Sequence, residues 1–381
     1  MIGEKFFYIL FQLYATLKTT IMNSMTDPVI LRTINAISPL DESAMKKAAA
    51  YQDSRAMPPG SMGELLKIGQ RLSGITGKLH NTLPKKRIIV LCADNGVVEE
   101  GVSSAPQSVT LAQAINMTKN LTGMSALAKH FKNEVQVVDV GINAAYKCPE
   151  VVDKSIRRGT NSFLRGEAMT REEALSALKV GIELAHTAKS EGISVFGVGE
   201  MGIGNTTTST AVLSLLTGVP PAQITGRGGC ITDEMLAHKK EVIEKGVALN
   251  KPNKDDVIDV LHKVGGLDLA AMCGVFLGCA ECKLPVVIDG YISIVAALCA
   301  ARLCPLAKNH FFPSHLSEEA GYKLAMTELS LVPYLNLGMR LGEGSGCPLA
   351  FEIMDAACVI MNDMATFEQA KIDDGYLKGL R

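Results

Sequence analysis

The chain has no tryptophan, few aromatic side chains and no surplus of either charge. Its 381 residues include 38 Lys and Arg against 39 Asp and Glu, a formal net charge of −1. Proteins that bind nucleic acid or an anionic membrane through charge carry an excess of Lys and Arg. The balance therefore supports neither a nucleic-acid partner nor a membrane partner. The remaining composition, 47% hydrophobic with 35 Gly, is typical of a packed α/β enzyme with many tight turns.

A long hydrophobic run is also missing. The apolar stretch near the start, residues 6–14, covers about nine residues, too few to span a bilayer. It follows Lys5 as in a signal peptide, but no convincing cleavage site comes after it. We expect residues 1–24 to be an N-terminal extension, either disordered or upstream of a true start at Met22 or Met25.

The cysteine spacing also shows no disulfide framework. Ten cysteines lie singly in apolar segments, whereas a secreted chain would be expected to pair them. We interpret them as reduced, mostly buried small side chains of a cytoplasmic protein. Cys279 and Cys282 form a C-x-x-C motif without a second pair or a nearby histidine. Packing is favoured there over a metal site.

Four short β-branched runs predict strands that are buried on both faces of a parallel sheet. Helical periodicity follows each run. This alternation predicts an α/β fold, a Rossmann-like, mostly parallel sheet with helices on both faces. The runs are Arg87–Asp94, Val135–Gly141, Ile193–Glu200 and Leu284–Gly290.

Helical patterning dominates both ends of the chain. We expect residues 25–80 and 316–381 to form one small helical domain, and residues 81–315 to form a large α/β catalytic domain. In the second helical segment, Ser317 followed by two glutamates predicts the start of a helix.

Polar residues follow each of the four predicted strands. Ligands of parallel α/β sheets bind beyond the carboxyl ends of the strands. We therefore expect these residues to share one cleft. They are Asp94, Asn95, Asp139, Glu200 and Asp289.

The most informative segment is residues 197–208, which packs four glycines, one carboxylate, one amide and three hydroxyls between a strand and a helix. Glycines allow close approach of backbone N–H groups, and a helix N-terminus favours an anion, so the segment suits a phosphate. Asn205 and Thr206 are placed to reach it. Glu200 would repel a phosphate there, which indicates a chemical role for its carboxylate.

A dinucleotide site is an alternative for the same segment, because Gly197, Gly199 and Gly202 satisfy G-x-G-x-x-G after a strand. That motif requires an acidic residue about 20 positions later for the ribose. Residues 201–232 contain no Asp or Glu, which disfavours it. A Walker loop is excluded because Gly-Lys-Ser/Thr does not occur.

Glu343 is a second isolated carboxylate, set in Gly342-Glu-Gly-Ser-Gly346. Flanking glycines leave room for a flat ring, and partial burial would make the carboxylate a competent base. An ordinary helix cap is the alternative. Lys239 suits either a phosphate or a solvated helix face together with Lys240. Ser314 and His315 favour a structural role, because neighbours in sequence have no special catalytic geometry.

These segments and several others together resemble one family, the nicotinate-nucleotide–dimethylbenzimidazole phosphoribosyltransferases. The resemblance runs from about residue 58 to 367. The matching motifs are Pro59-Gly-Ser-Met-Gly63, Ala93-Asp-Asn-Gly-Val97, Glu100-Gly-Val102, Gly199-Glu-Met-Gly-Ile-Gly-Asn-Thr-Thr207, Val264-Gly-Gly266, Pro285-Val-Val-Ile-Asp-Gly290, Pro313-Ser-His315 and Met339-Arg-Leu-Gly-Glu-Gly-Ser-Gly346.

The resemblance implies a reaction: nicotinate mononucleotide gives its phosphoribosyl group to an aromatic lower base of a cobamide, and nicotinate is released. It implies a homodimer and no metal or redox cofactor. It makes Glu343 the general base and gives Glu200 an orienting role in catalysis. It also implies a set of substrate-binding residues: Gly202, Gly204, Asn205, Thr206, Lys239, Gln113, Ser293, Asp289 and Gly344.

Two departures from the family pattern concern the acceptor. Asn95 stands where many members have histidine, and Ala105 where some have serine. A missing hydroxyl would remove a polar contact to the second ring nitrogen of a benzimidazole. This leaves phenol or p-cresol open as the acceptor, with the chain as one subunit of a heterodimer. A catalytically silent partner subunit and a nucleotide-binding sensor also stay open.

Overall fold

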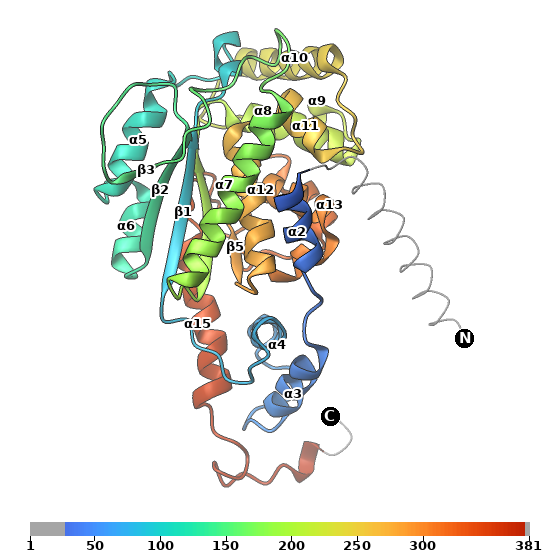
Figure 1. Cartoon of the computed structure of the whole chain (residues 1–381). Helices are drawn as coiled ribbons and strands as arrows, with labels where there is room; N and C mark the ends of the chain where they lie inside the picture. The colour runs from blue at the N-terminus through green and yellow to red at the C-terminus, as the bar shows by residue number, and fades with distance from the viewer. Residues whose placement is uncertain (1–26, 378–381) are drawn as a thin grey trace.

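The computed structural model describes residues 27–377 (Figure 1). The N-terminal extension expected at residues 1–24 lies outside the described residues. None of the helices in the described range is long and apolar enough to cross a membrane.

A six-stranded sheet lies at the centre of the molecule, and every pairing in it is parallel. The strands have the order β3-β2-β1-β4-β5-β6. They are β1 (Lys86–Ala93), β2 (Glu134–Gly141), β3 (Val151–Asp153), β4 (Val195–Met201), β5 (Val286–Ile288) and β6 (Phe311–Pro313).

This strand order reverses direction between β1 and β4. The chain builds outward from β1 to β3, returns to the middle and builds outward again from β4 to β6. The crevice at such a reversal is where open parallel sheets bind their ligands. The topology therefore places Asn95, after β1, and Glu200, near the end of β4, beside the same crevice.

Helices cover both faces of the sheet, as the sequence predicts (Figure 1). One face packs against α4 (Glu64–Thr76), α5 (Ser108–Thr118), α6 (Gly123–His130) and α15 (Cys347–Asp363). The other packs against α2 (Pro28–Ala36), α7 (Arg171–Ser190), α8 (Asn205–Thr217), α11 (Val257–Val264), α12 (Leu267–Glu281), α13 (Tyr291–Leu303) and α14 (Tyr322–Leu329). The remaining elements are α3 (Glu42–Asp53), α9 (Pro221–Ile224), α10 (Asp233–Asn250), η1 (Gly96–Glu100), η2 (Pro305–His310) and η3 (Gly375–Leu377).

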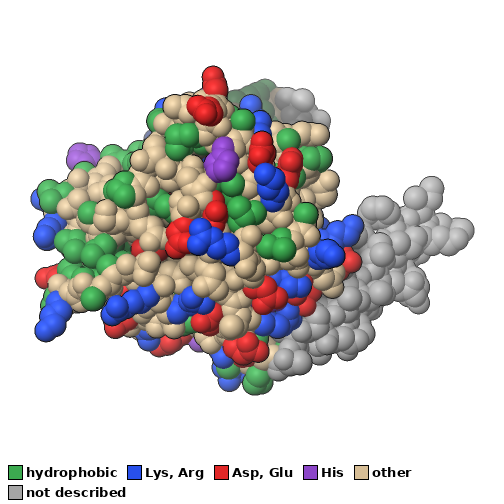
Figure 2. Space-filling model, turned by 90° about the horizontal axis from the view of Figure 1, so that it is seen from above, with side chains coloured by type: hydrophobic (Ala, Val, Ile, Leu, Met, Phe, Trp, Pro, Cys, Tyr) green, Lys and Arg blue, Asp and Glu red, His purple; other side chains and the backbone are tan. Residues whose placement is uncertain are grey.

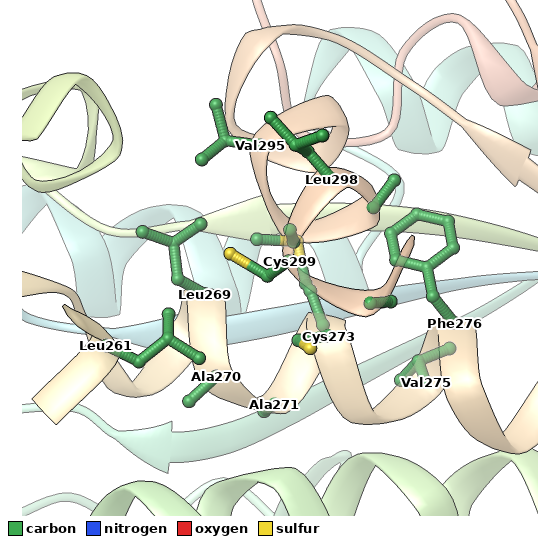
Figure 3. Packing of buried hydrophobic residues seen from close by; sticks show 14 of the residues in the cluster. Leu261, Leu269, Ala270, Ala271, Cys273, Val275, Phe276, Val295, Leu298 and Cys299 are labelled. Atoms are coloured by element: carbon green, nitrogen blue, oxygen red, sulfur yellow. The ribbon is translucent and has the colours of Figure 1, made fainter. Parts of the chain in front are cut away.

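The centre of the core lies between α12 and α13, where nearly every side chain of both helices is buried. Figure 3 shows Cys273 of α12 and Cys299 of α13 among apolar neighbours. All ten cysteines are free thiols, and seven of them are buried, which confirms the packing role for those seven. Cys148 and Cys282 are half-buried, and Cys230 is exposed.

The small helical unit differs from the prediction in its composition. Helices α3, α4 and α15 pack together below the sheet (Figure 1), and Arg55 pairs with Thr366 to join the two chain ends. Helix α2 packs instead on α7 and α12, and α14 packs on α13. Both therefore belong with the large unit, because their apolar faces are covered there. The division into two functional domains stays a prediction.

One local prediction is corrected, and two strands were not predicted. The helix expected at Ser317 begins at Tyr322, after Gly321, and the Ser317 hydroxyl accepts the Glu319 N–H within a loop. The edge strands β3 and β6 could not be predicted from the sequence. Each is only three residues long, and no longer apolar run surrounds it.

Candidate active site

A cavity of about 570 Å³ opens beyond the carboxyl ends of β1 and β4. Its walls come from the start of α5, the turn between β4 and α8, residues 227–231, α10 and the loop before α15. Among the predicted site residues, those that line it are Gln113, Glu200, Gly202, Gly204, Asn205, Thr206, Lys239 and Glu343.

The loop that carries Glu343 has an unusual backbone. Gly342, Glu343 and Gly344 have φ values of 81°, 64° and 88°, so all three are left-handed. The left-handed region is unfavourable for a residue with a Cβ, so surrounding contacts must hold Glu343 there. The Asp289 carboxylate supplies them: it accepts the N–H of Gly344 at 2.8 Å and that of Gly346 at 2.6 Å. Glu343 is therefore not a helix cap, since α15 begins at Cys347.

The same loop lies directly against β4. A Cβ on Gly199 would stand 2.7 Å from the backbone of Glu343, and one on Gly197 would stand 2.7 Å from the Cys347 side chain. These two glycines admit the loop and not a phosphate, which corrects the interpretation of all four as phosphate-binding. Gly204 has a φ of 94° and is the residue at which α8 begins.

The Glu343 carboxylate has one partner and one free oxygen. Its Oε1 accepts a hydrogen bond from Gln113 Nε2 at 3.3 Å. Its Oε2 is buried without a hydrogen-bond partner, and Glu343 forms no ion pair within residues 27–377. Burial raises the pKa of this carboxyl above its usual range. A partly buried carboxylate with an unused oxygen is suited to accept a proton from a bound ligand.

Glu200 faces Glu343 across the floor of the cavity. Its Oε1 accepts the Glu343 N–H at 3.3 Å, and its Oε2 accepts a short hydrogen bond from the Asn205 amide. Burial and the neighbouring Asp268 raise the pKa of Glu200 to about 8. In the unliganded protein Glu200 therefore carries a proton at neutral pH.

The opposite end of the cavity is cationic. Lys239 donates a hydrogen bond from Nζ to Thr206 Oγ1 at 2.8 Å, and its side chain is 1% exposed. Burial lowers its pKa to about 8, which the charge of Glu319 partly offsets. The alternative of a solvated helix face is therefore wrong for Lys239. Lys240, the next residue of α10, is half-buried and does not line the cavity.

Three predicted substrate contacts lie behind the wall. Asp289 holds the Glu343 loop, and Gly344 belongs to that loop. The Ser293 hydroxyl donates to the Val198 carbonyl at 3.0 Å and accepts the Asp289 N–H. None of the three lines the cavity. Their positions support the site without direct contact.

The expectation of one shared cleft for the strand-end residues is wrong in part. Of that set, only Glu200 lines the cavity. Asp139 lies beside a separate cavity and accepts the Tyr146 hydroxyl at 2.9 Å. Asn95 is buried behind the turn, bonded to Asp268. Strand order explains the position of Asp139, because β2 is one strand away from the reversal point.

Ser314 and His315 are both fully buried, and burial lowers the pKa of His315 to about 4. The Ser314 hydroxyl donates to the Asp289 carbonyl at 3.1 Å. The pair therefore braces the strand end that carries Asp289, in line with the structural role favoured from sequence.

Four further polar or charged cavity residues are not among the predicted site residues. They lie in three irregular segments of the chain: Arg227, Cys230, Glu319 and Arg340. Periodicity marks none of them, and only Arg340 belongs to a matching motif, in which no role was assigned to it. With Lys239, the two arginines give this end of the cavity the charge that suits an anionic group. On the face seen from above in Figure 2, red and blue side chains are interspersed, without a broad field of one sign.

A family model described as phosphoribosyltransferase matches residues 37–372 of this chain. The chain is 50% identical over 348 residues to a nicotinate-nucleotide–dimethylbenzimidazole phosphoribosyltransferase of Clostridium perfringens strain 13, covering 91% of this chain and 96% of that protein. The chain belongs to this phosphoribosyltransferase family. A protein of the same name from Geobacter sulfurreducens is 43% identical over 348 residues, covering 91% of this chain and 99% of that protein.

The fold agrees with that membership. The crystal structure of the Thermus thermophilus protein with this phosphoribosyltransferase name superposes with a TM-score of 0.83 at 34% identity. The match covers 88% of this chain and all of that one. The Rossmann-like architecture predicted from the sequence is therefore confirmed.

The buried acids of this phosphoribosyltransferase predict a pH dependence of its stability. The pKa of Asp289 is raised to about 7 and that of Glu200 to about 8. Each acid thus binds a proton more tightly in the folded chain than in the unfolded chain, so the free energy of unfolding falls as pH rises. For these two acids the fall begins above the usual carboxyl pKa of about 4 and ends near pH 8, while the buried histidines oppose it up to about pH 6.5. We therefore expect a net fall between about pH 6.5 and about pH 8.

Glu200→Gln removes one of the two titrating acids, so the fall should be shallower. Urea unfolding at the two ends of that pH range measures it. Glu172→Gln, on the exposed face of α7, is the control and should keep the slope of the original protein. An unchanged slope in Glu200→Gln would contradict the assigned protonation.

Proposed function

We propose that this chain transfers the phosphoribosyl group of nicotinate mononucleotide to 5,6-dimethylbenzimidazole or a related benzimidazole. The products are the α-ribazole phosphate and nicotinate, in the synthesis of cobamides. The observation that carries the proposal is the placement of Glu343: its unused carboxylate oxygen is buried at one cavity, opposite Glu200, and that cavity ends in Thr206 and Lys239. The names of the relatives support the same substrates.

The donor binds with its phosphate at the cationic end. The N-terminus of α8 and the left-handed Gly204 present backbone N–H groups, and Lys239 adds a full positive charge. The ribose then points toward Glu200. The nicotinate ring leaves with its nitrogen neutral, so the departing group needs no proton from an acid. The glycosidic carbon gains positive charge as the bond breaks, and an ionised Glu200 stabilises that charge.

The acceptor ring enters beside Glu343 and Gln113. It attacks the face of the sugar opposite the leaving group, which turns a β-nucleotide into an α-nucleotide. As the new carbon–nitrogen bond forms, the second ring nitrogen loses its proton to Glu343. The raised pKa of Glu343 makes it a better proton acceptor than an exposed carboxylate.

Ala105 lines the acceptor side of the cavity, but nothing in the described residues favours a phenolic acceptor. A parallel assay separates the acceptors: purified protein with nicotinate mononucleotide is offered 5,6-dimethylbenzimidazole in one reaction and phenol in another. The proposal expects turnover of the benzimidazole, and turnover of phenol alone would contradict it.

Glu343→Gln should lower kcat by roughly 100- to 10,000-fold, the usual contribution of a general base. The amide keeps the shape and the contact with Gln113 but cannot take the proton. Nicotinate release, followed by chromatography, measures the loss. Full activity of Glu343→Gln would show that another group is the base. If the unaltered protein, assayed without a partner chain, shows no activity, the chain is a silent subunit.

Lys239→Met should raise KM for nicotinate mononucleotide about tenfold or more, because a phosphate contact of a buried cation is lost. Methionine fills similar space without charge. Lys240→Met changes the adjacent lysine of α10, outside the cavity, and should leave KM unchanged. Equal effects of the two substitutions would argue against Lys239 as a phosphate ligand.

We further propose that the chain acts as a cytoplasmic homodimer. Ten free thiols support the compartment. Leu341 lines the cavity while 56% exposed, and Leu337 nearby in the chain is 58% exposed, so an apolar rim next to the site is available for a second copy. A sedimentation mass of a single chain would contradict the dimer.

A further inference from the structure

Asp268 lies one layer behind the cavity and carries an acid that the mechanism above does not use. It is in the first turn of α12 and has no exposed surface. Its Oδ1 accepts the Leu269 N–H at 2.9 Å. Its Oδ2 accepts hydrogen bonds from the amides of Asn205 at 3.3 Å and Asn95 at 3.4 Å.

One amide nitrogen joins this acid to Glu200. Asn205 Nδ2 donates to Glu200 Oε2 and also to Asp268 Oδ2. Both hydrogens of the amide are therefore used, one on each carboxylate. This fixes the plane of the Asn205 side chain, and with it the position of Glu200 on the cavity floor.

No cation accompanies the two acids. Within residues 27–377, neither Glu200 nor Asp268 forms an ion pair. The ionisable groups that face Glu200 are acidic. They are Asp268 from α12, Asp289 after β5, Glu343 from the loop before α15 and the Cys92 thiol of β1. Glu200 and Asp268 both contact the same amide nitrogen. In a buried site, two negative charges this close repel each other strongly, so ionisation of one carboxyl disfavours ionisation of the other.

We propose that Asp268 is a positioning residue of the transfer reaction: through Asn205 it orients Glu200, and its negative charge keeps a proton on Glu200 until the pyridinium nitrogen of the substrate arrives. This rests on the proposed function, because the pyridinium nitrogen of nicotinate mononucleotide supplies the positive charge.

The step balances without another reactant. Donor binding brings one positive charge beside Glu200, and the Glu200 proton leaves to bulk water. The carboxylate that remains faces the pyridinium and then the positive charge that moves to the sugar as the bond breaks. After nicotinate departs, Glu200 takes up a proton from water again. The raised pKa values, about 8 for Glu200 and about 6 for Asp268, agree with this order of protonation.

Asp268→Asn tests the inference, because it removes the charge and keeps an oxygen that can accept the Asn205 bond. Calorimetry of nicotinate mononucleotide binding, in two buffers with different heats of ionisation near pH 7, counts the protons released. The unaltered protein should release close to one proton. Asp268→Asn should release about half as many, because Glu200 is then about half ionised before the donor binds.

A kinetic readout accompanies the calorimetry. The acid limb of kcat/KM against pH should move to lower pH by about one unit in Asp268→Asn, since one pKa unit is a typical effect of a neighbouring charge. Asp139→Asn is the matched control: it is also a buried aspartate, but it lies at the separate cavity. It should keep the proton release and the pH profile.

The outcomes distinguish the two proposals. If the unaltered protein binds nicotinate mononucleotide but forms no α-ribazole phosphate, the proposed function fails. The role of Asp268 is then still tested by comparing the proton release on binding in the unaltered protein and in Asp268→Asn. If transfer is normal and Asp268→Asn keeps both the proton release and the pH profile, the inference about Asp268 is overturned. Should Asp268→Asn fail to fold, Asp268→Ser offers a hydroxyl to the Leu269 N–H and carries the same expectations.

Discussion

The Asp289 carboxylate is the contact on which the active site depends. It accepts two backbone N–H groups from the loop before α15, and these bonds hold three successive residues in the left-handed conformation. Without these hydrogen bonds, the unfavourable left-handed conformation of Glu343 would not be stabilised. The loop also requires a glycine at position 199, because a Cβ there would collide with the Glu343 backbone. A buried acid and a strand glycine thus place the proposed base.

The two ends of the cavity differ in charge, although Glu319 lies near Lys239. Glu200 and Glu343 occupy the floor, where burial raises the pKa of both. Lys239 and the two arginines occupy the other end. A substrate with an anionic phosphate and a cationic glycosidic nitrogen matches this division. The separation also explains how a carboxylate can lie inside the segment that we propose binds phosphate: Gly204 is the residue at which α8 begins, and Glu200, near the end of β4, lies on the cavity floor.

Much of the fold follows from local pattern. The four longer apolar runs predict strands, and each overlaps one, because each combines β-branched residues with burial on both faces. Asp41 caps α3 as a local sequence signal should. The two edge strands cannot be predicted in this way, because an apolar run of three residues carries too little pattern. The prediction at Ser317 is wrong because its hydroxyl makes the same bond in a loop turn as in a helix cap.

By itself, the sequence determined the α/β class, the family and the two isolated glutamates, because these depend on residues close together in the chain or on whole motifs. Tertiary structure decided which polar residues meet. Glu343 and Glu200 are hydrogen-bonded across 143 positions, and Asp268 reaches Glu200 only through Asn205. Asp139 follows a strand as Glu200 does, yet strand order moves it to another cavity. Protonation follows the same logic, since a pKa depends on burial and on charges that only folding brings near.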